Sequence, residues 1–128
     1  MIIGTHFLLY SKDAEADRAF FRDVLEFPCI DVGEGWLIFG MSPAEAGIHP
    51  LEGDFARDHA GHSLLGAVLY LMCDDLSATI AALQTRNVQC TEVEQAPWGS
   101  KTTIPLPSGG EIGLYQPRHP TALGLTSK

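Results

Sequence analysis

"GTHFLLYSKDAEADRAFFRDVLEF", residues 4–27, places a histidine among apolar residues directly ahead of an amphipathic segment. Alternation over residues 2–10 predicts a strand with apolar side chains on both faces, so both faces are expected to be buried. Asp13 is expected to open a helix, because a short acidic side chain can cap the first turn. His6 is therefore expected to point away from bulk water. The apolar stripe of the helix consists of Ala16, Ala19, Phe20, Val24 and Phe27.

Short strands are predicted after this helix. Residues 29–32 and 36–40 are rich in strand-forming residues and are separated by the turn former Gly33-Glu34-Gly35. Residues 47–49 provide a further strand candidate. Residues 50–62, PLEGDFARDHAGH, show no periodicity and are expected to form a linker.

The same order of elements is predicted beyond the linker. Residues 66–73 are expected to form a strand, and Asp75 is expected to start a helix. Three further strands are predicted at 88–93, 100–106 and 111–116. At an offset of 62 residues the two halves align, which predicts an internal repeat. The matched pairs are Gly4 with Gly66, Leu9 with Leu71, Asp13 with Asp75, Ala16 with Ala78, Ala19 with Ala81 and Phe21 with Leu83.

Composition excludes several classes of partner. The 128 residues carry 16 acidic and 8 basic side chains, and the basic ones are scattered, which argues against nucleic acid. The amino-terminal residues lack the basic start of a signal peptide, and no run of about 18 apolar residues predicts a membrane span. The three cysteines have no CxxC spacing, as expected of reduced thiols. A cytoplasmic protein is expected.

The chain resembles the vicinal oxygen chelate superfamily, which includes glyoxalase I, extradiol dioxygenases, fosfomycin resistance enzymes and bleomycin resistance proteins. The resemblance covers about residues 2–118 and is carried by the paired βαβββ patterns, the histidine ahead of "FFRDVLEF" and the closing "WGSKTTIPLPSGGEIGLYQP". It implies one α+β domain, a homodimer, and two βαβββ modules that form a half-open, barrel-like mixed sheet with helices outside. The expected boundaries are module one at 1–50, a linker at 51–64, module two at 65–118 and a C-terminal tail at 119–128.

The resemblance also implies where metal ligands would lie, on the first and fourth strands of each module. His6 matches the first position, and His49, or less well Glu45, falls near the second. At the other two positions this chain has Val68 and Gly113, neither of which can ligate. Glu111 shares the face of Gly113 but lies about 6.6 Å along the strand, far beyond metal–oxygen bonds of about 2.0–2.2 Å.

We therefore expect a small-molecule-binding protein with an aromatic-lined cavity, no cofactor and no metal centre of the usual kind. Apolar walls with a few hydroxyl groups and one imidazole suit a small, partly aromatic ligand. A filled core is the alternative interpretation of the same residues. The expected inner face carries His6, Leu8, Tyr10, Val68, Tyr70, Met72 and Tyr115, with Glu111 as a further ligand-binding candidate.

Enzymatic activity stays open on two further hypotheses. The first is a metal-dependent lyase or dioxygenase in which His6, His49 and Glu111 hold Zn, Ni, Fe or Mn. The second is a metal-free enzyme with His6 as general base and Tyr70 or Tyr115 as oxyanion donor. Four further residues, His59, His62, Arg118 and His119, are expected at the surface, and Trp36 and Trp98 at module or subunit junctions.

Overall fold

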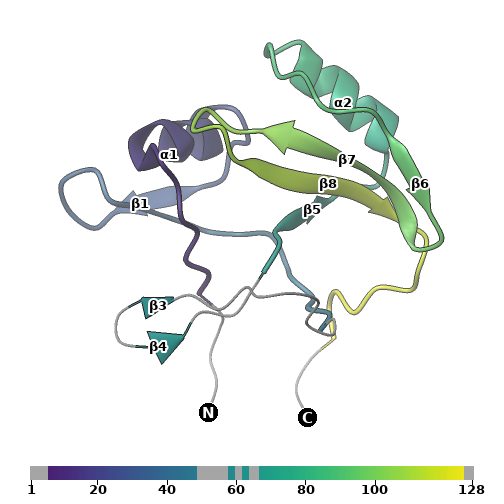
Figure 1. Cartoon of the computed structure of the whole chain (residues 1–128), viewed down its shortest axis with the longest axis horizontal. Coiled ribbons are helices and arrows are strands. Elements are labelled where there is room, and N and C mark those ends of the chain that lie inside the picture. Colours follow the sequence, from purple (N-terminus) through teal and green to yellow (C-terminus); the bar gives the residue numbers. More distant parts are fainter. Residues whose placement is uncertain (1–5, 49–57, 60–61, 64–66, 126–128) are drawn as a thin grey trace.

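A computed structural model describes residues 6–48, 58–59, 62–63 and 67–125 (Figure 1). The first helix, α1, spans Ala14–Asp23 and begins where predicted, because the Asp13 side chain accepts a hydrogen bond from the Ala16 N–H at 3.1 Å. The second helix, α2, spans Leu76–Gln84, and Asp75 caps it in the same way at 3.0 Å from the Ala78 nitrogen.

A short hairpin follows α1. Its strands, β1 (Cys29–Asp31) and β2 (Leu37–Phe39), pair in antiparallel fashion, with Ile30 opposite Ile38. The turn is closed by the Asp31 carboxyl group, which accepts a hydrogen bond from the Gly33 N–H at 2.8 Å. Both strands and the glycine turn were predicted. The Phe39 ring lies 5.5 Å from the Phe21 ring, so the hairpin packs on α1.

The second half of the chain builds a four-stranded mixed sheet in the order β5-β8-β7-β6. β5 runs parallel to β8, whereas β7 is antiparallel to both β8 and β6. The bounds are Tyr70–Met72 for β5, Glu94–Ala96 for β6, Gly99–Pro105 for β7 and Glu111–Pro117 for β8.

Both helices cover one face of this sheet. Figure 1 shows α1 and α2 on the same side of β7 and β8, and the core lies between these layers. Alternate positions of β7 and β8 face the helices, as the period of two requires. The two helices that the structure describes leave the opposite face of β5, β8 and β7 uncovered. The buried hydrophobic core consists of Phe21, Leu76, Leu83, Val88, Ile104, Ile112 and Leu114.

One polar contact ties α1 to the sheet of the second half. The buried carboxyl group of Asp17 accepts hydrogen bonds from the Ser108 backbone N–H at 3.1 Å and from the Ser108 hydroxyl at 2.7 Å. The Ser11 hydroxyl donates a third bond at 2.6 Å. Because Ser108 lies in the turn between β7 and β8, this carboxyl group fixes the position of α1 relative to the sheet.

Three strand predictions differ from the structure. Residues 6–10 form no strand, and their apolar side chains are exposed, because no neighbouring strand of the described chain pairs with them. The predicted strand at 88–93 is also irregular, and the edge strand forms at 94–96 instead, where the register with β7 begins. Gly66 of the strand predicted at 66–73 lies outside the described residues; within 67–73, residues 70–72 are strand and pair with β8.

The linker region is described only in part. Two short pieces, β3 (Asp58–His59) and β4 (His62–Ser63), form an antiparallel pair where a linker without structure was expected. Residues 47–48 are irregular, and His49 lies outside the described residues.

The predicted α+β class, with an open mixed sheet and helices on its outside, is confirmed. No helix among the described residues is long and apolar enough to cross a membrane.

Candidate functional site: an aromatic cluster on the open sheet face

Three aromatic rings meet on the sheet face that the helices leave uncovered. Tyr70 comes from β5, Tyr115 from β8, and Trp98 from the turn between β6 and β7. The ring centroids are 5.4 Å apart for Tyr70 and Tyr115, 5.4 Å for Trp98 and Tyr115, and 6.1 Å for Tyr70 and Trp98. The planes cross at 72–85°, which is the favourable edge-to-face arrangement. These three residues are called the aromatic cluster below.

Gly113 makes room for the cluster. Tyr70 and Gly113 are directly paired in the parallel ladder, and the Tyr70 ring lies flat over the glycine. A Cβ atom at position 113 would lie 2.9 Å from Tyr70 Cγ and closer still to Cδ1 and Cε1 of that ring. Any side chain at 113 and the present position of Tyr70 therefore exclude each other.

Arg118 holds the turn that carries Trp98. The Arg118 backbone N–H donates to the Trp98 carbonyl at 2.8 Å. Its guanidinium donates to the carbonyls of Ala96 and Gly99, the latter at 3.2 Å. It also donates to Gln95 Oε1 and Ser100 Oγ, both at 3.1 Å. One side chain thus binds both strands that flank Trp98, as the planar fork of arginine allows.

Beyond β8 the chain places a histidine against the cluster. His119 Nδ1 lies 2.8 Å from the Pro120 carbonyl, and since a carbonyl can only accept, Nδ1 carries the proton. His119 Nε2 lies 3.4 Å from the Tyr115 hydroxyl, which donates to this nitrogen in the tautomer with the proton on Nδ1. Glu45 reaches the same place: its Oε2 lies 3.9 Å from His119 Nε2, while Oε1 accepts from the Ala122 N–H at 2.8 Å.

The local environment raises the pKa values of two residues at the cluster, Tyr115 and Lys101. Burial, followed by the charges of Glu45 and Tyr70, raises the pKa of Tyr115, which is only 8% exposed. Lys101 Nζ lies 3.2 Å from Glu94 Oε2, and the hydrogen bond to that carboxylate, followed by the charge of Tyr70, raises the pKa of the lysine. Tyr115 is therefore a neutral hydrogen-bonding group at neutral pH.

The sequence-predicted site residues are only partly brought together. Tyr70 and Tyr115 are in contact, and Met72 lies on the same face in register with Tyr115. His6 and Tyr10 lie in the exposed irregular segment before α1, and Val68 is 74% exposed ahead of β5. The exposed Glu111 accepts a hydrogen bond from the Thr103 hydroxyl at 3.1 Å, and His49 lies outside the described residues.

Two of the four positions that the resemblance assigns to metal ligands hold residues that cannot bind a metal. Val68 has no donor atom, and the space beside Gly113 is filled by the Tyr70 ring rather than left for a carboxylate. Among the side chains that the structure describes, no three His, Cys, Asp or Glu residues gather as metal ligands. The side chains of His59 and His62 are not among them.

Four contributors to this site were missed or undervalued in the sequence. Arg118 and His119 were expected at the surface, Glu45 was considered only as a poorer metal ligand, and Trp98 was assigned to a junction. Their contacts depend on how the tail returns after β8 to meet Glu45, which no local pattern encodes. The one available signal was the i, i+4 separation of Tyr115 and His119 at a strand end.

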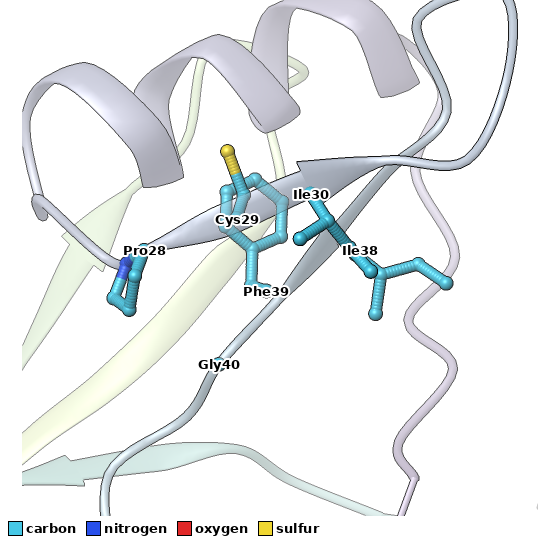
Figure 2. A pocket seen from close by; sticks show the side chains of 6 residues that line it. All are labelled: Pro28, Cys29, Ile30, Ile38, Phe39 and Gly40. Atoms are coloured by element: carbon cyan, nitrogen blue, oxygen red, sulfur yellow. The ribbon is translucent and has the colours of Figure 1, made fainter.

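A separate apolar hollow of about 360 Å³ lies on the β1–β2 hairpin. Figure 2 shows the side chains around it, which come from neighbouring positions of the two strands. None of them belongs to the aromatic cluster. The lining residues are Pro28, Cys29, Ile30, Ile38, Phe39 and Gly40.

Comparisons with known proteins agree with this fold. Residues 5–113 match the sequence model of the Glyoxalase/Bleomycin resistance protein/Dioxygenase superfamily. No curated protein matches the chain significantly.

Solved structures give more detailed likenesses. The chain is 27% identical to TnmS3, an antibiotic binding protein from Streptomyces sp. CB03234, with a TM-score of 0.61 over 91% of this chain and 98% of that one. A glyoxalase/bleomycin resistance protein from the same organism is also 27% identical, with a TM-score of 0.53 over 83% and 93%. Lactoylglutathione lyase from Agrobacterium tumefaciens has a TM-score of 0.60 over 89% and 92%. It is only 15% identical, so this likeness shows the fold alone.

Proposed function

Because the chain belongs to the Glyoxalase/Bleomycin resistance protein/Dioxygenase superfamily, we propose that it binds a small aromatic ligand on the aromatic cluster, without the metal centre typical of the family's enzymes. The family provides the fold, and the chemistry must be argued from the site. No cofactor takes part in the proposed function.

The observation that carries this proposal is the Tyr70 ring over Gly113. At the position where the family's enzymes place a metal-binding carboxylate, this chain presents an aromatic surface. Tyr70 and Trp98, which is 39% exposed, offer ring surface to a partner, while Tyr115 supports both from behind. Rings that are already packed against each other lose little conformational entropy on binding, which favours stacking of a planar ligand.

The similarity to TnmS3 supports the same conclusion. That protein is an antibiotic binding protein, and it is 27% identical to this chain over nearly its whole length. We therefore place the ligand among antibiotic-like small molecules with a planar aromatic part, bound and sequestered rather than converted.

The proposal extends to a second copy of the chain as partner. The consecutive residues Phe7, Leu8 and Leu9 are about half exposed, although a soluble monomer rarely leaves a contiguous apolar patch at its surface. A homodimer would cover it. Sedimentation velocity is expected to show a dimer that Leu8→Glu weakens, and a monomeric wild-type protein at all concentrations would contradict this part of the proposal.

Binding is tested with 1-naphthylmethanol, an uncharged planar aromatic alcohol, by protein-observed NMR titration. The chain has two tryptophans, so Trp98→Ala and Trp36→Ala form a matched pair. Trp36 stacks with Arg18 at 4.5 Å on the other half of the molecule.

Trp98→Ala is expected to weaken binding about tenfold, as the loss of one aromatic contact with its buried area implies. Trp36→Ala is expected to leave the affinity unchanged. Absence of saturable binding, or an equal loss in both variants, would contradict the proposed function.

A further inference from the structure

A polar edge borders the aromatic cluster on the side of the C-terminal segment. It consists of Glu45 and His119, which come from regions far apart in the sequence and meet at Tyr115. Their side chains are 20% and 33% exposed, respectively. Both groups are thus open to a ligand and yet partly shielded from water, which strengthens their electrostatic interactions.

The two groups present acceptors to the same space. His119 Nδ1 faces the Pro120 carbonyl, and in the tautomer with the proton on Nδ1 the Nε2 lone pair lies on the side of Tyr115 and Glu45. Glu45 Oε2 lies 3.9 Å from that nitrogen, and its orientation is fixed because Oε1 accepts from the Ala122 backbone N–H at 2.8 Å. Two acceptors at this separation attract a donor between them.

The separation matches a protonated amine. Charge-assisted N–H···O and N–H···N bonds have lengths of about 2.8 Å, and an ammonium nitrogen at that distance from both acceptors is compatible with a span of 3.9 Å. The angle from Glu45 Oε2 through the ammonium nitrogen to His119 Nε2 is then about 90°. An ammonium group tolerates this angle because it has three rotatable donors.

The surrounding charge also favours a cation. The chain has a formal net charge of −8, and the negative charge of Glu45 contributes to the raised pKa of Tyr115. Of the two cations that the structure describes beside the cluster, Lys101 is paired with Glu94 at 3.2 Å, and the Arg118 guanidinium donates to oxygens around the Trp98 turn. In addition, the electron-rich faces of the cluster attract positive charge.

We propose that Glu45 and His119 form a subsite for a protonated amino group of the ligand, so that the protein recognises aromatic amines rather than neutral aromatic molecules. The inference rests on the proposed function, because the aromatic part of the same ligand stacks on Tyr70 and Trp98. The ammonium group then donates to Glu45 Oε2 and to His119 Nε2, where it replaces the long contact of 3.4 Å from the Tyr115 hydroxyl.

The test uses two probes that differ only in charge: 1-naphthylmethylamine, which is protonated at neutral pH, and uncharged 1-naphthylmethanol. Dissociation constants for both are measured at pH 7.5 by NMR titration of the full chain. The wild-type protein is expected to bind the amine about tenfold more tightly than the alcohol, as expected for a charge-assisted hydrogen bond in a partly exposed site.

Glu45→Gln removes the charge and keeps the oxygen that accepts from Ala122, so it is expected to remove the preference while leaving affinity for the alcohol unchanged. His119→Gln is a second variant that does not disturb residues 41–48, and it is expected to reduce the preference several-fold. Glu92→Gln is the control, because it removes one negative charge from an exposed position that belongs neither to the aromatic cluster nor to the polar edge.

Equal affinity of the wild-type protein for both probes, or a preference that Glu45→Gln leaves intact, would overturn the subsite and leave the proposed function standing. A preference that Glu92→Gln reduces as much as Glu45→Gln would also overturn it, since net charge alone would then explain the selectivity. If neither probe binds, the proposed function and the subsite both fail.

Discussion

The two halves of the chain have similar helices and different sheets. Asp13 and Asp75 cap their helices with the same hydrogen bond, and Phe21 and Leu83, also 62 positions apart, are both buried. The sheets differ, however. The second half pairs four strands, whereas the first half has a two-stranded hairpin, and residues 6–10 lie outside any ladder of the described chain.

The number of buried hydrophobic residues in each half depends on its strands rather than on its helix. Phe21 is the single buried hydrophobic residue from the described first half, whereas the second half buries seven such residues, including Ile104, Ile112 and Leu114. The difference lies mainly in the strands, because β7 and β8 together bury Ile104, Ile112, Leu114 and Tyr115. The second half is therefore expected to carry most of the stability of the chain.

The sharpest test of this difference compares two isoleucines. Ile104 in β7 is 1% exposed, and Ile30 in β1 is 64% exposed. Ile104→Ala is expected to lower the free energy of unfolding by about 3–4 kcal/mol, because it leaves a cavity in the core. Ile30→Ala is expected to lower it by about 0.5 kcal/mol or less. Urea denaturation measures both, and similar losses would contradict the unequal division of the core.

Asp17 tests how the halves are joined. Asp17→Ala removes three hydrogen bonds and leaves Ser108 without its partner, so the free energy of unfolding is expected to fall by about 2 kcal/mol. The control is Asp31→Ala, which removes one exposed bond to the Gly33 N–H and is expected to have little effect. If both variants unfold at the same urea concentration, Asp17 does not join the halves.

Arg118 tests how the second half holds its aromatic cluster. In a Trp36→Phe background, Trp98 is the remaining tryptophan and reports on its own turn. Arg118→Met is expected to shift the Trp98 emission to the red and to increase its quenching by acrylamide, at a loss of about 1 kcal/mol in stability. The matched control is Arg86→Met, because Arg86 bonds to the Asp23 carbonyl, away from the cluster.

An unchanged Trp98 spectrum in Arg118→Met would show that Arg118 does not position this ring. The same spectral change in Arg86→Met would attribute the effect to general loosening of the chain.

The smallest effect concerns the thiols of the second half. Burial raises the pKa of Cys73, as do the charges of Asp74 and Asp75, and burial also raises the pKa of Cys90. Because these pKa values are higher in the folded state, their contribution to stability is present below the unfolded thiol pKa and is lost as the pH rises through the folded value. A slight loss of stability is expected above about pH 8.5.

Reaction with Ellman's reagent provides the direct measurement for these thiols. Cys73 and Cys90 are expected to react more slowly at pH 8 than the same residues in urea-unfolded protein, with the difference shrinking toward alkaline pH. Equal rates in the folded and unfolded protein would contradict the raised pKa values.

Much of the fold could be predicted from local patterns. The N-caps Asp13 and Asp75, the glycine turn at 33–35 and the alternating strands near the C-terminus each encode their own structure, because hydrogen bonds to neighbours in the sequence dominate there. The strand predicted at 2–10 is different. A strand requires a partner, and its apolar sequence shows only that a partner is needed.

The candidate site could be predicted only in outline. Strand parity placed Tyr70 and Tyr115 on one face, but it could not show that the Tyr70 ring covers Gly113, since that contact depends on the register of two strands distant in sequence. Similarly, Glu45 and His119 meet through the return of the tail. Asp17, a polar residue on a largely apolar helix face, is buried because Ser108 satisfies it from the other half.

We propose that in this chain the aromatic cluster takes the place of the metal centre found in enzymes of the family. The most direct measurement is the metal content of untagged protein, purified without chelator, by inductively coupled plasma mass spectrometry, with His6→Ala alongside. Our account predicts far less than one Zn, Ni, Fe or Mn per chain in both proteins. Close to one metal per wild-type chain, lost in His6→Ala, would contradict it.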